Sequence, residues 1–201
     1  MEIKRKNPKV FETIIARVKD LDGKVGKAGW FHTSRYADGT PVAYIAAIQE
    51  FGVHINHPGG TPYRIGEDGR AVFVSKAEGA GLKTTKAHPI VIPPRPFMRP
   101  TVLRESQNWI ALMASGSKAV LAGNSTGSDV MEAVSGKAAA DIAVSITQVF
   151  SPPLKASTIA ARRRARADKK TVGLLSKPLV DSGRMLEQVN HSVETEYGTG
   201  Q

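Results

Sequence analysis

The chain contains no cysteine among its 201 residues, and this absence removes several classes of function at once. Disulfide bonds, thiolate metal sites, iron–sulfur clusters and cysteine nucleophiles all require that side chain. Aromatic residues make up only 6% of the chain, so we expect a core built mainly from valine, isoleucine, leucine and alanine. No apolar run reaches the roughly 18 residues that a membrane helix needs, and the basic start lacks a secretory signal pattern. We therefore expect a protein made in the cytoplasm, with no membrane partner.

Positive charge exceeds negative charge, giving a formal net charge of +10 at pH 7. Much of the excess lies in residues 155–170, called the basic segment below, where Asp168 is the single acidic residue. Its cations are Lys155, Arg162, Arg163, Arg164, Arg166, Lys169 and Lys170. Such a block is typical of a nucleic-acid-binding arm, of a contact for an acidic protein, or of a solvated helix face. Charge alone does not choose among them.

Apolar spacing predicts four main helices. The first begins at Pro8 and carries a stripe that we expect to be buried, formed by Val10, Ile14, Ile15, Val18 and Leu21. The second follows Pro41 and ends at Gly52. A long helix from Pro100, interrupted by Gly116, and another capped by Ser128 and Asp129 are predicted to form an αα-hairpin.

Strand patterns are weaker and lie around a long polar excursion. Alternation predicts strands at 24–31 and 185–193 and a hairpin at 63–75. Residues 53–89 hold so little apolar content that we expect a protruding hairpin or loop. The predicted fold class is α+β, a single domain over residues 1–201. In it, a small mixed or antiparallel sheet packs with about four helices.

Motifs for catalysis or metal binding are weak. His54 and His57 lack the third ligand and the positioned carboxylate of a zinc site, so we expect polar loop histidines. The chain has no G-x-S-x-G turn, no phosphate-binding glycine loop and no dinucleotide fingerprint. Asp181-Ser182-Gly183 occurs once, whereas an aspartic-protease site needs two carboxylates, so Asp181 is expected to cap a helix. We expect no cofactor, no metal and no enzymatic activity.

Two short clusters are unusual for a plain core. Glu50, next to Phe51, interrupts the apolar end of a predicted helix, and the proline-rich stretch 92–100 places arginines on both sides of Phe97. We expect Glu50 to pair with Arg95 or Arg99, and Phe51 to pack against Phe97. Such a contact serves either to stabilise the fold locally or to form an interface.

Three motifs in a fixed order resemble a known family. They are E-F-G at 50–52, I-P-P-R-P-F-M-R-P at 92–100 and P-L-V-D-S-G-R-M-L at 178–186. Together they resemble the neck and tail-completion proteins of long-tailed bacteriophages, a group that includes virion morphogenesis proteins of Mu-like phages and is similar to the lambda minor tail protein Z. The family-motif residues are Glu50, Phe51, Gly52, Pro94, Arg95, Pro96, Phe97, Arg99, Asp181 and Gly183.

The resemblance implies a structural role in the virion. Such proteins form a ring at the head–tail junction, expected to be a hexamer, and join a finished tail to the DNA-filled capsid. The implied partners are further copies of the chain, the neighbouring head–tail connector, the tail terminator or tail tube proteins, and genomic DNA passing through the channel without sequence specificity. In this role the basic segment would line the channel or contact an acidic neighbour. The alternative is a stand-alone nucleic-acid-binding protein that acts through the same segment, although no base-stacking aromatics or known nucleic-acid-binding signature accompany it.

Overall fold

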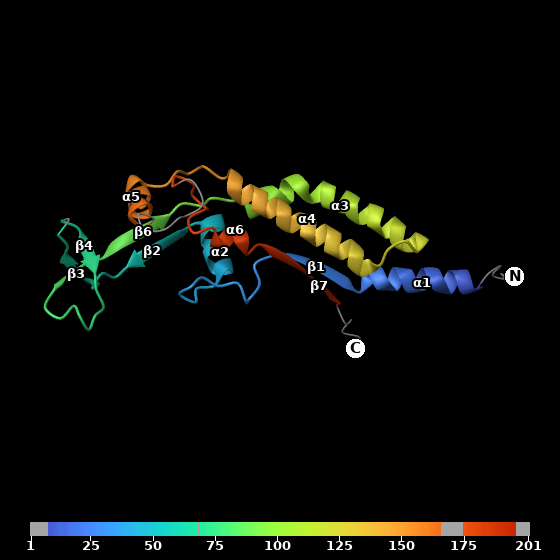
Figure 1. Cartoon of the computed structure of the whole chain (residues 1–201), viewed down its shortest axis with the longest axis horizontal. Helices are drawn as coiled ribbons and strands as arrows, with labels where there is room; N and C mark the ends of the chain where they lie inside the picture. Colours follow the sequence, from blue (N-terminus) through green and yellow to red (C-terminus); the bar gives the residue numbers. More distant parts are fainter. Residues whose placement is uncertain (1–7, 68, 166–174, 196–201) are drawn as a thin grey trace.

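Six helices form in the residues that the computed structural model describes, 8–67, 69–165 and 175–195. They are α1 (Pro8–Asp22), α2 (Val42–Phe51), α3 (Met98–Ala122), α4 (Gly127–Gln148), α5 (Ala156–Ala165) and α6 (Arg184–Glu187). Figure 1 shows an elongated molecule in which α1, α3 and α4 lie toward one end and α2 and α6 lie near the middle. None of the described helices is long and apolar enough to cross a membrane.

The predicted αα-hairpin is present as α3 and α4. Thr126 caps α4: its hydroxyl accepts a hydrogen bond from the Asp129 N–H at 3.2 Å, and the Asp129 carboxylate accepts one from the Thr126 N–H at 2.9 Å. The predicted cap at residues 128–129 is therefore wrong, because Asp129 is the third residue of a reciprocal capping box. Gly116 lies where the helices meet, since a Cβ there would stand 2.7 Å from Cγ1 of Val130.

The strands form three small antiparallel sheets, and this arrangement confirms the α+β class. In the first sheet β1 (Lys24–Gly29) pairs with β7 (Asn190–Thr195) and packs on α4. In the second, β2 (Val53–His57) pairs with β6 (His88–Ile92). In the third, β3 (Pro62–Ile65) lies between β4 (Ala71–Phe73) and β5 (Lys83–Thr84).

The excursion at 53–89 forms a projecting arm, as predicted. The β2–β6 ribbon leads away from α3 and α4, with α5 beside it, and β3 and β4 lie at its far end (Figure 1). The hairpin at 63–75 is therefore not part of the sheet formed by β1 and β7, which corrects our expectation of one small sheet. Because the ribbon holds the hairpin away from the body, the hairpin strands β3 and β4 cannot pair with β1.

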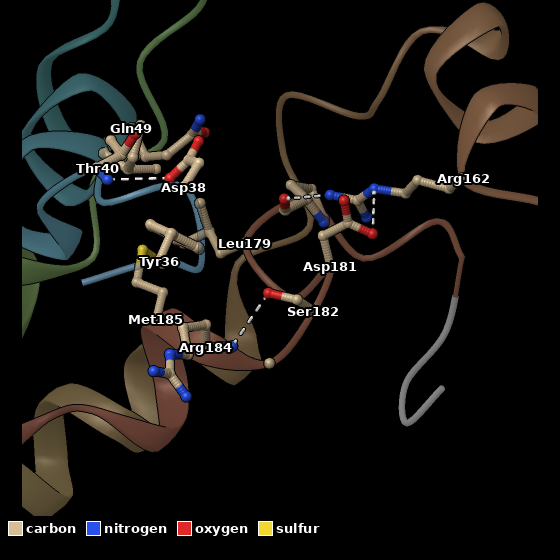
Figure 2. Close-up of a pocket in the computed structure, with 13 residues that line it drawn as sticks. Tyr36, Asp38, Thr40, Gln49, Arg162, Leu179, Asp181, Ser182, Arg184 and Met185 are labelled. Carbon is tan, nitrogen blue, oxygen red and sulfur yellow. Dashed lines mark hydrogen bonds and ion pairs between the residues drawn. The ribbon is translucent and has the colours of Figure 1, made fainter. Parts of the chain in front are cut away.

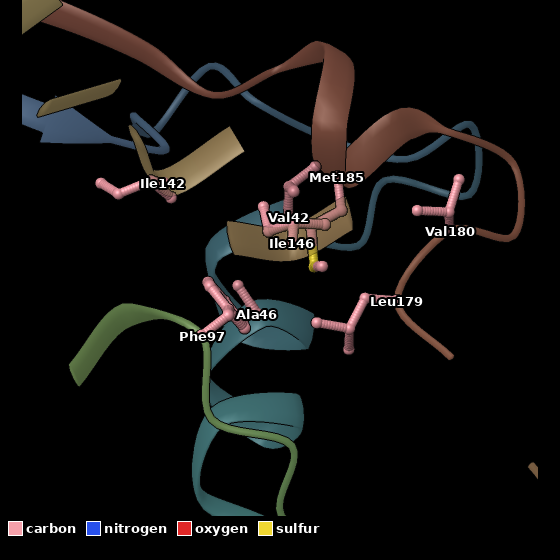
Figure 3. Close-up of a cluster of buried hydrophobic side chains, with 8 residues drawn as sticks. All are labelled: Val42, Ala46, Phe97, Ile142, Ile146, Leu179, Val180 and Met185. Carbon is pink, nitrogen blue, oxygen red and sulfur yellow. The ribbon is translucent and has the colours of Figure 1, made fainter. Parts of the chain in front are cut away.

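The main core lies in the middle of the molecule, where distant segments meet (Figure 3). Its buried side chains come from α2, the start of α3, the end of α4 and residues 179–185: Val42, Ala46, Phe97, Ile142, Ile146, Leu179, Val180 and Met185. Phe97 is 1% exposed, and its ring meets the ring of Trp30 edge-on at 5.7 Å between centroids. Aliphatic side chains dominate this core, as the composition predicts.

The apolar stripe of α1 is exposed, so the prediction that it is buried is wrong. Val10, Ile14, Ile15 and Val18 all lie open to solvent, and only Leu21, at the end of the stripe, is half-buried. The polar side of α1 touches the α3–α4 turn instead: Arg17 donates to the Leu121 carbonyl at 2.7 Å, and Asp20 accepts from the Gly127 N–H at 2.6 Å. Successive helix residues turn by about 100°, so these polar contacts point the stripe away from the body.

Candidate functional site

Glu50, in the last turn of α2, anchors the start of α3. Although it is only 4% exposed, its carboxylate accepts hydrogen bonds from the backbone N–H groups of Phe97 at 2.7 Å, Met98 at 2.9 Å and Arg99 at 3.1 Å. These donors belong to a helix start that lacks a side-chain cap of its own, so Glu50 supplies the cap from another helix. Burial alone would raise the pKa of Glu50, but the hydrogen bonds outweigh it and hold that pKa below its ordinary value.

The predicted ion pair forms with Arg99, whereas the predicted aromatic pair does not form. The Arg99 Nε lies 2.9 Å from Oε1 of Glu50, and its guanidinium stands 4.8 Å above the Phe51 ring. Phe51 is 63% exposed, while Phe97 is buried against Trp30. The two phenylalanines diverge because α2 ends at Phe51, on the solvent side, and the proline-rich stretch turns Phe97 inward. Trp30 was not among the residues that the sequence singled out, since no local pattern links it to Phe97.

The proline-rich stretch runs extended along the end of α2. Burial alternates from Pro94 to Phe97: Arg95 and Phe97 are buried, whereas Pro94 and Pro96 are exposed. Gly52 adopts a φ of 73°, and a Cβ there would stand 2.8 Å from the Pro94 nitrogen. A side chain at residue 52 would therefore push this stretch away from α2.

Arg95 does not pair with Glu50. Its Nε donates to the Pro152 carbonyl at 2.7 Å, Nη2 donates to the Pro153 carbonyl at 3.2 Å, and Nη1 donates to the Gln49 side chain at 3.3 Å. Burial, and then the nearby charge of Arg162, lower the pKa of Arg95. Arg95 thus fastens the segment after α4 to the end of α2 through neutral oxygens.

Arg162 belongs to the fold rather than to a free basic surface. Its guanidinium donates to the carbonyls of Lys177 at 2.6 Å and Pro178 at 3.1 Å, and its Nε lies 3.2 Å from a carboxylate oxygen of Asp181 (Figure 2). Arg162 is therefore committed largely to the fold, and its contact with DNA or an acidic partner stays a prediction. Arg163 and Arg164 on α5 are exposed. The remaining predicted contacts, Arg166, Lys169 and Lys170, lie outside the described residues.

Asp181 is not the helix cap that the sequence predicts. Gly183, at a φ of 81°, occupies the cap position of α6, and the Ser182 hydroxyl accepts from the Arg184 N–H at 3.3 Å. Asp181 instead holds Arg162, whose side chain is mostly buried. This ion pair joins α5 to the D-S-G turn. Local sequence patterns could not predict it, because the two residues lie far apart in the sequence.

A cavity of about 410 Å³ opens beside this turn (Figure 2). Polar side chains from α2, α5 and the two neighbouring turns line it, among them Tyr36, Asp38, Arg162, Asp181 and Arg184. Burial, followed by the charges of Asp181 and Asp38, raises the pKa of Tyr36, so its hydroxyl stays protonated at neutral pH.

Histidines and carboxylates do not gather into a metal site anywhere in residues 8–67, 69–165 and 175–195. His57 instead stacks on His88 at 5.1 Å between ring centroids, and its Nδ1 accepts a hydrogen bond from the Gly59 N–H at 3.0 Å. His54 is exposed on the β2–β6 ribbon. His57 and His88 thus contact each other across the β2–β6 ribbon, whereas His191 on β7 pairs with Glu132 of α4.

Comparisons with known proteins give no match to a family model, a curated protein or a solved structure. Function is therefore inferred from the residues and their geometry.

Proposed function

We propose that the chain is a structural protein of the phage head–tail junction, which completes the tail and joins it to the DNA-filled capsid as one subunit of a ring. The observation that carries the proposal is the convergence of the three ordered motifs. E-F-G supplies the Glu50 anchor, the proline-rich motif supplies the backbone that Glu50 binds, and the D-S-G motif supplies core residues beside both. Residues spread over more than a hundred positions thus build one connected part of the fold, as expected of motifs that act together.

The surface supports a role in assembly rather than catalysis. Exposed large apolar residues lie on α1, on α3 and at the end of the arm; Leu103, Ile110 and Phe73 are examples. Contiguous exposed apolar patches mark sites of protein–protein contact.

The shape also fits a subunit that contacts neighbours on two sides. The outward stripe of α1 lies toward one end of the molecule, and the β2–β6 arm projects at the other (Figure 1). Contacts of one end with the opposite end of the next copy are heterologous, and such contacts close into a ring when the rotation permits. We propose sixfold closure, with a head–tail connector and a tail terminator or tail tube protein as axial neighbours.

The basic segment has a reduced part in this proposal. Arg162 serves the fold, which leaves Lys155, Arg163 and Arg164 as the exposed described cations of the basic segment for weak, sequence-independent phosphate contacts in the channel. The same three side chains are the support for the alternative, a stand-alone nucleic-acid-binding protein. Retention of duplex DNA by a monomer at physiological salt would favour that alternative.

Localisation in particles tests the proposal directly. Gold-labelled antibody against the chain should mark the junction between head and tail, and a reconstruction of that junction should place the chain in a sixfold ring in the virion. Absence of the chain from purified particles would refute the proposal, and another stoichiometry would refute the hexamer.

A matched pair of variants tests the assembly surface. Ile14→Glu places a charge in the outward stripe of α1, whereas Lys19→Glu changes charge on another side of the same helix. We expect Ile14→Glu to fold but to be excluded from particles, and Lys19→Glu to be incorporated. Equal incorporation of both variants would contradict a role for the stripe in assembly.

A further inference from the structure

A second cavity, of about 340 Å³, lies between β6 and α5. Residues 90–92 of β6 give it an apolar wall, and Arg95 and Lys155 give it positive charge; Arg162 also lines it but is paired with Asp181. No carboxylate of the described residues lines it. Its lining is therefore cationic and apolar together.

The Arg95 charge has no negative partner in the part of the chain that the structure describes. The side chain is 5% exposed, and its three hydrogen bonds all go to neutral oxygens. A guanidinium carries five N–H groups, so two on its terminal nitrogens remain for a further acceptor. The nearby charge of Arg162 has the same sign and, after burial, lowers the pKa of Arg95 further. Buried cations are costly without an anion, and this one lines an open cavity.

We propose that this cavity binds an acidic side chain carried by an extended segment of a partner protein. A carboxylate can accept from the remaining N–H groups of Arg95, and the exposed Lys155 adds a second cation. The volume admits a side chain but not a nucleic acid duplex, whose phosphates stand on a wide, stiff backbone. The inference goes beyond the proposed function and stands on the cavity alone.

The neighbouring strand gives such a segment a place to lie. β6 pairs with β2 on one side, and no described strand pairs with its other side. An extended peptide can add to such an edge through main-chain hydrogen bonds, while pockets beside the edge select alternate side chains. Arg163 and Arg164 follow the cavity residue Arg162 on α5 and are exposed. Their charges would attract an acidic segment at low salt.

Binding of a defined probe tests the proposal with the full chain in solution. The probe is a short, fluorescein-labelled peptide of alternating valine and glutamate, followed by fluorescence anisotropy; the same peptide with glutamine in place of glutamate is the reference. The double variant Lys155→Glu/Thr158→Glu reverses the charge of Lys155 and adds a negative charge at Thr158, both exposed residues that line the cavity, and Lys118→Glu is an exposed control on α3. Circular dichroism verifies that all variants fold.

We expect the parent and Lys118→Glu to bind the glutamate peptide equally, and the double variant to bind it at least tenfold more weakly. Binding should weaken as salt rises, and the glutamine peptide should bind at least tenfold more weakly than the glutamate peptide. Equal affinity of the double variant, or no binding by the parent, would overturn the proposal. The proposal would also be overturned, in favour of a phosphate site, if a short DNA duplex displaced the peptide and its binding were lost in the same double variant. These results do not depend on particle localisation, so the site and the proposed function can fail separately.

Discussion

Replacing Glu50 by glutamine tests the central feature of the junction, a buried carboxylate that caps α3 from another helix. Glu50 accepts four hydrogen bonds, three from backbone N–H groups and one from the Arg99 side chain. A glutamine keeps one oxygen, which can serve two of these donors. Its amide NH₂ group then faces the other two N–H donors and leaves them without an acceptor, because an amide nitrogen accepts no hydrogen bond.

The expected loss follows from the two bonds that cannot form. A hydrogen bond to a charged group contributes about 1.5–3 kcal/mol net. The Arg99 side chain is 61% exposed, so solvent screens its share and the lower value applies there. We expect Glu50→Gln to lower the free energy of unfolding by about 3 kcal/mol at pH 7. For a chain of this size the melting temperature should fall by about 6–12 °C.

The pH dependence provides an independent signature. The pKa of Glu50 is lower in the folded chain than its ordinary value, which is about 4.3 for an unfolded chain. A carboxyl group of this kind contributes its stability above the unfolded pKa and loses it as the pH falls through the folded pKa. The difference between the parent and Glu50→Gln should therefore be constant from pH 7 to about pH 5 and shrink below that pH.

Urea unfolding followed by circular dichroism at several pH values measures both effects. Glu194→Gln is the control, because Glu194 forms an exposed ion pair with Lys27 and should change stability by less than about 1 kcal/mol. A loss below about 1 kcal/mol for Glu50→Gln, no greater than for an exposed pair, would refute the capping argument. A difference that persists unchanged in acid would refute the assignment to the Glu50 charge.

Three further predictions concern packing and the basic segment. Phe97→Ala should cost about 3–5 kcal/mol in urea unfolding, because it empties a fully buried site; a melt equal to the parent's would contradict the packing. Gly116→Ala should cost about 1–3 kcal/mol despite better helix propensity, since the new methyl group meets Val130. Val130→Ala should cost less stability in the Gly116→Ala background than in the parent, because it relieves the contact with the new methyl group. Equal costs in this double-mutant cycle would show that the two residues do not touch. Arg162→Gln should lower the melting temperature, whereas Arg163→Gln should leave it nearly unchanged; equal melts would show that Arg162 is not a structural residue.

Local chemistry in the sequence determined much of the fold. The starts and ends of α1 and α2, the αα-hairpin, the hairpin of the arm and the projection of residues 53–89 follow from apolar periodicity and from turn residues. The Glu50–Arg99 pair could also be predicted, since opposite charges stood out in two otherwise apolar segments. Signals of this kind act over a few residues and depend little on the rest of the chain.

Only the tertiary structure decided which faces are buried and which charges are used. The stripe of α1 has the spacing of a buried face, yet its polar side meets the α3–α4 turn and leaves the stripe outside. Arg162 stands among other arginines in the sequence, yet it alone of the described ones binds Asp181 and the carbonyls at 177 and 178. Periodicity reports that a face is apolar, and composition reports that a segment is charged. Neither reports what lies opposite, because that depends on segments brought together from distant parts of the chain.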